Sequence, residues 1–203
     1  MTLVEEILIR YLGKVEYVPT LRAMRAFTAQ RDEATPDEIW ILEHPPVYTL
    51  GQGAGAALKF ETGISVVKTD RGGDITYHGP GQAVLYTLID LARRGIKVKQ
   101  FVRLLEQSVI DLIGPRAELR PGAPGVYVAG AKIAALGIRV TRGRAYHGLA
   151  LNVGMDLSAF AAIDPCGHPG LAVTQARDLG FSETAAVLGE RLAAILVQHL
   201  DHA

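Results

Sequence analysis

Apolar residues recur at helical spacing in two long segments of the chain, residues 98–113 and 183–200. The stripe consists of Phe101, Leu104, Leu105, Val109, Leu112 and Ile113 in the first segment, and of Leu188, Leu192, Ile195, Leu196 and His199 in the second. A weaker stripe covers residues 19–33. Side chains three and four positions apart share one face of a helix, so the pattern predicts three amphipathic helices.

Short apolar runs bounded by glycine, proline and polar turns predict β-strands. The runs cover residues 7–12, 37–43, 47–50, 65–68, 83–88, 125–128, 131–140 and 146–153. The turn at residues 141–144 joins the last two runs as a hairpin. Because strands follow strands directly in two stretches, the pattern favours an α+β fold with much antiparallel pairing. No linker or repeat is visible, so residues 1–203 are expected to form one domain.

Composition and charge narrow the classes of function. The 21 Lys+Arg balance the 21 Asp+Glu, so no global positive field attracts nucleic acid or an anionic membrane. The N-terminus lacks the pattern of a signal peptide, and no apolar run reaches the ~18 residues of a membrane-spanning helix. A single cysteine forms no internal disulfide. These features predict a cytoplasmic protein without nucleic-acid or membrane partners.

Three segments approach cofactor or metal motifs, but each lacks a required feature. Gly51–Ala56 followed by Asp70 is close to a dinucleotide fingerprint, yet no long helix or βαβ alternation follows. In residues 125–132 the lysine does not directly follow the second glycine, as a phosphate loop requires. The D-x-C-x-H pattern at 164–168 lacks the paired spacing of a zinc site. We therefore expect no cofactor and no metal.

The lone cysteine, Cys166, stands in a turn of glycine and proline. A buried, inert cysteine is the plainer interpretation, but the neighbouring glycines permit close approach of a substrate to the sulfur. A reactive thiol needs a cation nearby to favour the thiolate. Lys132, in a segment of small residues, is a candidate, and it would contribute about 4 kcal/mol at ~4 Å and an effective dielectric of ~20. His78, His147 and His168 are alternatives as a base. The other histidines are interpreted as turn or terminal residues: His44, His199 and His202.

Four motifs follow one another along the chain: RGGDITYHGPGQ (71–82), GAKIAALGI (130–138), HGLALNV (147–153) and DPCGHPGL (164–171), with EHPPVYTLG (43–51) beside them. Together they resemble the octanoyltransferase family of lipoate biosynthesis. The resemblance covers most of the chain from about residue 40 to residue 180. It implies a mixed, largely antiparallel sheet flanked by helices, similar to the catalytic domain of biotin and lipoate protein ligases.

The resemblance also implies the reaction, which is transfer of an octanoyl group from acyl carrier protein to the ε-amine of a lipoyl-domain lysine. Cys166 is the implied acyl-thioester nucleophile, and Lys132 is implied to activate it. The implied acceptors are the lipoyl domains of 2-oxoacid dehydrogenase complexes and the glycine cleavage H protein. The implied acyl-binding residues are Arg71, Gly72, Gly73, Asp74, Ile75, Thr76, Tyr77, His78, Ala135, Leu136, Gly137, Gly148, Leu149 and Ala150.

Two alternatives remain open, an ATP-dependent lipoate or biotin ligase on the same fold and a non-catalytic acyl-binding or redox-sensing protein. An acyl carrier protein is acidic, so a donor of this kind is expected to meet a local basic cluster on a chain of zero net charge. Two clusters are candidates: Arg93, Arg94, Lys97, Lys99 and Arg103, and Arg139, Arg142 and Arg144.

Overall fold

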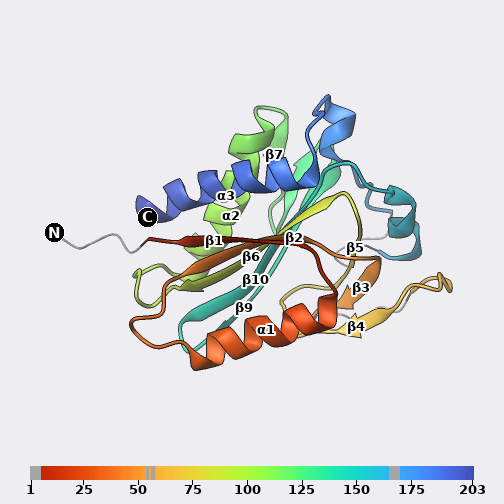
Figure 1. The fold of residues 1–203 in the computed structure, drawn as a ribbon. Helices are drawn as coiled ribbons and strands as arrows, with labels where there is room; N and C mark the ends of the chain where they lie inside the picture. Colours follow the sequence, from red (N-terminus) through yellow and green to blue (C-terminus); the bar gives the residue numbers. More distant parts are fainter. Residues whose placement is uncertain (1–5, 54, 56–57, 165–169) are drawn as a thin grey trace.

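A seven-stranded sheet forms the centre of the molecule, in the order β1-β2-β6-β10-β9-β8-β7 (Figure 1). The computed structural model describes residues 6–53, 55, 58–164 and 170–203. The strands are β1 (Leu8–Lys14), β2 (Glu38–Glu43), β6 (Gln82–Asp90), β7 (Ala117–Leu119), β8 (Val126–Val128), β9 (Ala131–Thr141) and β10 (Arg144–Asn152). Only β1 and β2 are parallel among these neighbours, so the expected mixed, largely antiparallel α+β fold is confirmed.

A smaller sheet lies beside the main one and consists of β4 (Val66–Lys68), β3 (Val47–Leu50) and β5 (Ile75–His78). β3 pairs in parallel with β4 and antiparallel with β5. The loop that leads into β5 is tied to the main sheet, because Gly72 N–H donates to the Ile138 carbonyl on β9 at 2.9 Å. This bond brings the segment before β5 against β9.

Helices cover both faces of the main sheet (Figure 1). α2 (Val98–Ile113) and α3 (Ala185–Asp201) pack together on one face, and α1 (Tyr17–Gln30) covers the other. Alternation along β2 shows the division, since Ile39 and Ile41 belong to the core under α2 and α3, whereas Trp40 and Leu42 belong to the core under α1. Strands buried on both faces need apolar side chains at nearly every position, which explains the continuous apolar runs in the sequence.

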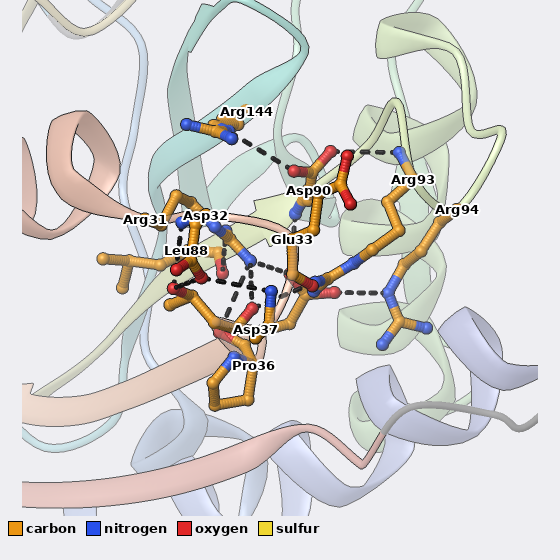
Figure 2. A network of polar contacts seen from close by, with 12 residues as sticks. Arg31, Asp32, Glu33, Pro36, Asp37, Leu88, Asp90, Arg93, Arg94 and Arg144 are labelled. Atoms are coloured by element: carbon orange, nitrogen blue, oxygen red, sulfur yellow. Dashed lines mark hydrogen bonds and ion pairs between the residues drawn. The ribbon is translucent and has the colours of Figure 1, made fainter.

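A buried ionic network surrounds Asp37, the residue directly before β2, at one end of the sheet (Figure 2). Asp37 is fully buried, and its carboxylate contacts Arg31 at 2.6 Å, Arg93 at 3.0 Å and Arg94 at 2.6 Å. Burial alone would raise the pKa of Asp37, but hydrogen bonds from Arg94, from a backbone N–H and from Arg31 outweigh it and lower that pKa. Removing one partner from such a network typically costs about 3–5 kcal/mol.

Several members of the two basic clusters take part in this network or in a neighbouring ion pair. Arg93 and Arg94 bind Asp37, and Arg144 contacts Asp90 at 3.3 Å, so all three take part in structural ion pairs. The exposed members of the two clusters are Lys97, Lys99, Arg103, Arg139 and Arg142. Among the described residues, no helix has the length and apolar character needed to cross a membrane.

Candidate active site

A pocket lies between the main sheet, the segment leading into β5 and the start of α1. Glycine, alanine and leucine residues of β9 and β10 form much of its wall. Of the fourteen acyl-binding residues implied by the family resemblance, all line this pocket except Gly72 and Tyr77. Gly72 lines an adjoining cavity of about 400 Å³, and Tyr77 packs against Tyr48 and Phe160 in the core of the small sheet.

The register between β9 and β10 fixes the shape of the wall. Ala135 lies opposite Ala150, and Gly137 lies opposite Gly148. A Cβ on Gly137 would lie 2.9 Å from the Gly72 carbonyl oxygen, and one on Gly148 would lie 2.1 Å from the Leu85 carbonyl oxygen. Both positions therefore require glycine for backbone approach, and both leave the pocket free of side-chain bulk.

Lys132 lies on β9 at one end of this pocket and is buried, with 3% of its surface exposed. Its Nζ donates to the Pro124 carbonyl at 3.1 Å and lies 5.1 Å from the centre of the Tyr127 ring. Lys132 lines a small cavity, and Thr76 and Ala135 line both that cavity and the larger pocket. Lys132 is thus separated from the apolar pocket by these two small residues.

The chain that follows Cys166 returns to Lys132. Lys132 N–H donates to the Ala172 carbonyl at 2.8 Å, and Thr174 N–H donates to the Lys132 carbonyl at 3.0 Å, forming a parallel bridge with Val173. Cys166 itself lies outside the described residues, as does His168. Backbone hydrogen bonds therefore hold the chain after residue 169 to Lys132, the residue that the resemblance implies to activate Cys166.

Side-chain hydrogen bonds connect this bridge to His78, which lines the pocket. Asn152 donates to the Thr174 carbonyl at 3.0 Å and accepts from Gln82 at 3.0 Å, and Gln82 accepts from His78 Nδ1 at 2.7 Å. His78 is buried, and burial together with the nearby His44 lowers its pKa to about 3. His78 is therefore neutral at pH 7, with its proton on Nδ1 because the Gln82 oxygen accepts there.

His147 lies at the other end of the pocket, with Asp70. His147 Nε2 is 2.8 Å from one oxygen of Asp70, and the Tyr146 hydroxyl donates to the second oxygen at 2.7 Å. Burial alone would raise the pKa of Asp70, but hydrogen bonds from His147, Tyr146 and Arg25 outweigh it and lower that pKa well below its usual range. Burial also lowers the pKa of His147, although Asp70 opposes the shift.

An unusual backbone conformation brings both side chains to Asp70. His147 has a φ of 61° within β10, a left-handed value that few residues other than glycine adopt. Neighbouring side chains of a regular strand point to opposite faces, yet the Tyr146 and His147 rings stack with centres 5.0 Å apart. Such local strain persists where the surrounding structure holds it, and it is frequent at functional sites.

His44, which the sequence pattern places in a turn of no functional interest, is fully buried beside the site. Its Nδ1 lies 2.6 Å from the Val15 carbonyl and its Nε2 lies 2.7 Å from the Tyr86 hydroxyl. Burial lowers its pKa to about 4. The turn prediction is correct, because His44 lies between β2 and β3, but the two prolines after it give no sign that its side chain is buried.

Sequence reasoning missed three lining residues. Tyr17, Val84 and Tyr86 line the pocket in addition to the implied set, and so does His147, which the sequence offered as an alternative base. Val84 and Tyr86 alternate along a strand that is buried on both faces, so no alternation of polar and apolar residues marked them. Within the described part of the chain, no three His, Cys, Asp or Glu side chains are grouped as metal ligands would be.

Comparison with known proteins agrees with this architecture. The lipoyl protein ligase A/B catalytic domain family matches residues 16–191 of the chain. Among solved structures, a bi-partite lipoate protein ligase from Thermoplasma acidophilum aligns over 95% of this chain and 82% of its own, with a TM-score of 0.67 and 16% identity. A biotin protein ligase from Aquifex aeolicus aligns over 95% of this chain and 70% of its own, with a TM-score of 0.57 and 7% identity. The fold is that of the catalytic domains of lipoate and biotin ligases.

Curated relatives are much closer in sequence. An octanoyltransferase of Dechloromonas aromatica (strain RCB) is 57% identical over 197 residues, covering 95% of this chain and 96% of the relative. An octanoyltransferase of Thiobacillus denitrificans (strain ATCC 25259 / T1) is 62% identical over 180 residues, covering 87% and 83%. The chain belongs to the octanoyltransferase family.

Proposed function

We propose that this octanoyltransferase moves the octanoyl group in two steps through a thioester on Cys166. In the first step the Cys166 thiolate attacks the carbonyl carbon of a donor thioester, a new C–S bond forms, the donor C–S bond breaks and the donor leaves as a thiolate. In the second step a neutral lysine ε-amine attacks, a C–N bond forms, the C–S bond to Cys166 breaks, and the proton that the amine loses is taken up by the departing sulfur. Thioester exchange is nearly isoenergetic, and amide formation runs downhill, so the sequence of steps needs no ATP.

The length of the pocket is the observation that carries this proposal. The lining residues of β10 run from Ala150 to His147, an advance of three residues, about 10 Å at ~3.4 Å per residue. With C–C bonds of about 1.5 Å, an extended eight-carbon chain spans about 9 Å. Burying such a tail contributes about 0.8 kcal/mol for each methylene, which positions the thioester at the end near Lys132.

The placement of Lys132 supports the proposal that it activates the thiol. Lys132 is buried, it lines the small cavity that adjoins the acyl pocket, and its backbone bonds to the chain that follows Cys166. An ammonium group beside a cysteine stabilises the thiolate and the oxyanion that develops on the carbonyl. His78, neutral and engaged by Gln82, is less suited to that role.

The donor in this proposal is an octanoyl acyl carrier protein, and its docking face is the start of α2. Val102 lines the cavity of about 400 Å³ that shares Gly73 and Gly137 with the acyl pocket. Lys99 and Arg103 flank Val102 on this helix and are exposed. Basic side chains beside the mouth of the pocket would steer an acidic carrier.

The acceptors in this proposal are the lipoyl domains of 2-oxoacid dehydrogenase complexes and the glycine cleavage H protein. Support comes from the archaeal structure above, whose description pairs the ligase with its E2 lipoyl domain. In this proposal, residues 1–203 act as one cytoplasmic catalytic domain and use no cofactor.

Mass spectrometry of the full-length protein tests the mechanism. Incubation with an octanoyl carrier thioester, without ATP, is expected to add one octanoyl group on Cys166, and a lipoyl domain added next is expected to remove it onto lysine. Labelling that requires octanoate and ATP would indicate a ligase instead. The absence of any label, with an acyl chain still bound, would indicate a binding protein.

A further inference from the structure

His147 presents an unused hydrogen-bond acceptor at the inner end of the acyl pocket, the end farthest from Lys132. The residue lines the pocket, and 1% of its surface is exposed. Asp70 is ionised and only accepts hydrogen bonds, so the proton of the neutral imidazole lies on Nε2, 2.8 Å from Asp70. Nδ1 is left with a lone pair and no proton.

Nδ1 has no hydrogen-bond partner among the described residues. Buried polar atoms are nearly always paired, so a buried acceptor without a partner inside a binding pocket points to a ligand group. His147 lines the pocket, whereas Asp70 is not among the described residues that do, and Nδ1 is the ring nitrogen that does not contact Asp70. Tyr86, whose ring lies edge-on to His147 at 6.1 Å, closes the same end.

The neighbours of Asp70 hold this arrangement in one orientation. One carboxylate oxygen of Asp70 accepts a hydrogen bond from His147. The other accepts from the Tyr146 hydroxyl at 2.7 Å and from Arg25 Nε at 2.9 Å. The left-handed backbone at His147 aims the ring at Asp70 at the expense of the regular strand conformation. The chain thus maintains a fixed acceptor where the tail of an eight-carbon chain ends.

We propose that His147 Nδ1 accepts a hydrogen bond from a hydroxyl group near the tail of the acyl chain, so that the site takes hydroxylated medium-chain acyl thioesters as well as octanoyl. This inference rests on the proposed function, because it assumes that the pocket holds an acyl chain with its thioester at the Lys132 end. Asp70 acts as a positioning residue, since it decides which ring nitrogen carries the proton.

Asp70→Asn reverses the polarity of this acceptor with little change of shape. Tyr146 and Arg25 both donate to the second oxygen, so the amide oxygen of the variant takes that position and its NH₂ group faces His147. The NH₂ group donates to Nε2, and the proton of His147 moves to Nδ1. In the variant, His147 Nδ1 therefore donates a hydrogen bond, whereas in the wild-type protein it accepts one.

The test compares 7-hydroxyoctanoyl and 7-oxooctanoyl thioesters of one carrier, which share a carbon skeleton, with octanoyl as the reference. The wild-type protein is expected to prefer the hydroxyl over the ketone in kcat/KM by about threefold to tenfold, the worth of one hydrogen bond. Asp70→Asn is expected to lose or reverse this preference. The matched control is Arg25→Gln, which alters the same carboxylate without moving the proton and is expected to keep the wild-type ratio.

Nitrogen NMR of His147 gives a readout independent of turnover and of the stability of the variant. In the wild-type protein 7-hydroxyoctanoate is expected to shift the Nδ1 resonance, and 7-oxooctanoate is expected to leave it in place. Equal shifts, or equal hydroxyl-to-ketone ratios in wild type and Asp70→Asn, would overturn the inference. A protein that transfers no octanoyl group at all would instead overturn the proposed function.

Discussion

Lys132 and Thr174 are joined backbone to backbone, with Thr174 N–H donating to the Lys132 carbonyl at 3.0 Å. The residue proposed to activate the thiol therefore also holds the end of the segment that carries Cys166. Side-chain substitutions at Lys132 leave this backbone bond in place. A substitution can therefore remove the charge of Lys132 without changing the path of the backbone.

Replacing Cys166 with alanine or serine is expected to abolish octanoyl transfer, because the acyl-thioester has no other thiol on which to form. Transfer to a lipoyl domain, followed by mass spectrometry, measures the effect, and thermal unfolding checks that the fold is intact. Turnover by the alanine variant near the wild-type rate would contradict the covalent mechanism.

Lys132→Met is expected to move the pH midpoint of Cys166 alkylation by iodoacetamide upward by more than about one unit, because a cation near the thiolate is lost. Methionine keeps the apolar stem, which packs beside Gly125. The alkylation rate is followed from neutral to alkaline pH in both proteins. An unchanged midpoint would mean that Lys132 acts on the carbonyl or the acceptor only.

Reversing Lys99 and Arg103 to glutamate is expected to slow association with a carrier-bound donor by about tenfold at low salt, because steering charges act mainly on the on-rate. A small octanoyl thioester has no acidic surface, so its rate is expected to stay the same. Arg142→Glu, on the exposed hairpin, is the matched control. Equal losses with both donors would show that the α2 residues support the pocket instead.

Gly148→Ala is expected to destabilise the fold by more than about 2 kcal/mol, because the added methyl meets the rigid Leu85 carbonyl oxygen at 2.1 Å. Gly55→Ala is the control, since no described residue lies within 4 Å of its added Cβ, and surface changes of this kind stay within about 0.5 kcal/mol. Urea unfolding, followed by Trp40 fluorescence, compares them. Equal stability of the two variants would show that β6 and β10 separate easily.

Acid is expected to destabilise the protein below about pH 6.5, the ordinary pKa of histidine. The folded pKa of His44 is about 4 and that of His78 about 3, so between these values and 6.5 the unfolded chain binds protons that the folded chain does not. His44 alone accounts for about 3 kcal/mol, most of it lost by pH 4. Urea unfolding at pH 7, 6 and 5 measures the slope. A flat response over this range would mean that these histidines are not buried neutral.

Much of the fold follows from local patterns in the sequence. The stripe over residues 98–113 matches α2 (Val98–Ile113), because a clear apolar face and the left-handed Gly114 define both helix and end. The weaker stripe over 19–33 is displaced relative to α1 (Tyr17–Gln30). There Arg31 leaves the helix with an extended backbone and binds Asp37, a partner that helical periodicity does not reveal.

Less of the site follows from such patterns. The motif at residues 130–138 indicates Lys132, but its closeness to Thr76 depends on how a second sheet folds over the first. Asp70 resembles the ribose-binding acid of a dinucleotide fold in the sequence, whereas in the structure it binds His147. A contact between residues so far apart in the chain depends on tertiary packing, which spacing alone does not encode.

The ionic cluster at Asp37 has a consequence for how the sequence can drift over evolutionary time. Four arginines, Arg31, Arg93, Arg94 and Arg144, gather there around two carboxylates, Asp37 and Asp90. Loss of one outer arginine still leaves three cations around the two carboxylates, whereas early loss of Asp37 would leave Arg31, Arg93 and Arg94 without the buried carboxylate that they share. Lineages are therefore expected to shed arginines first and the aspartate last, so the order of replacement is set by electrostatics.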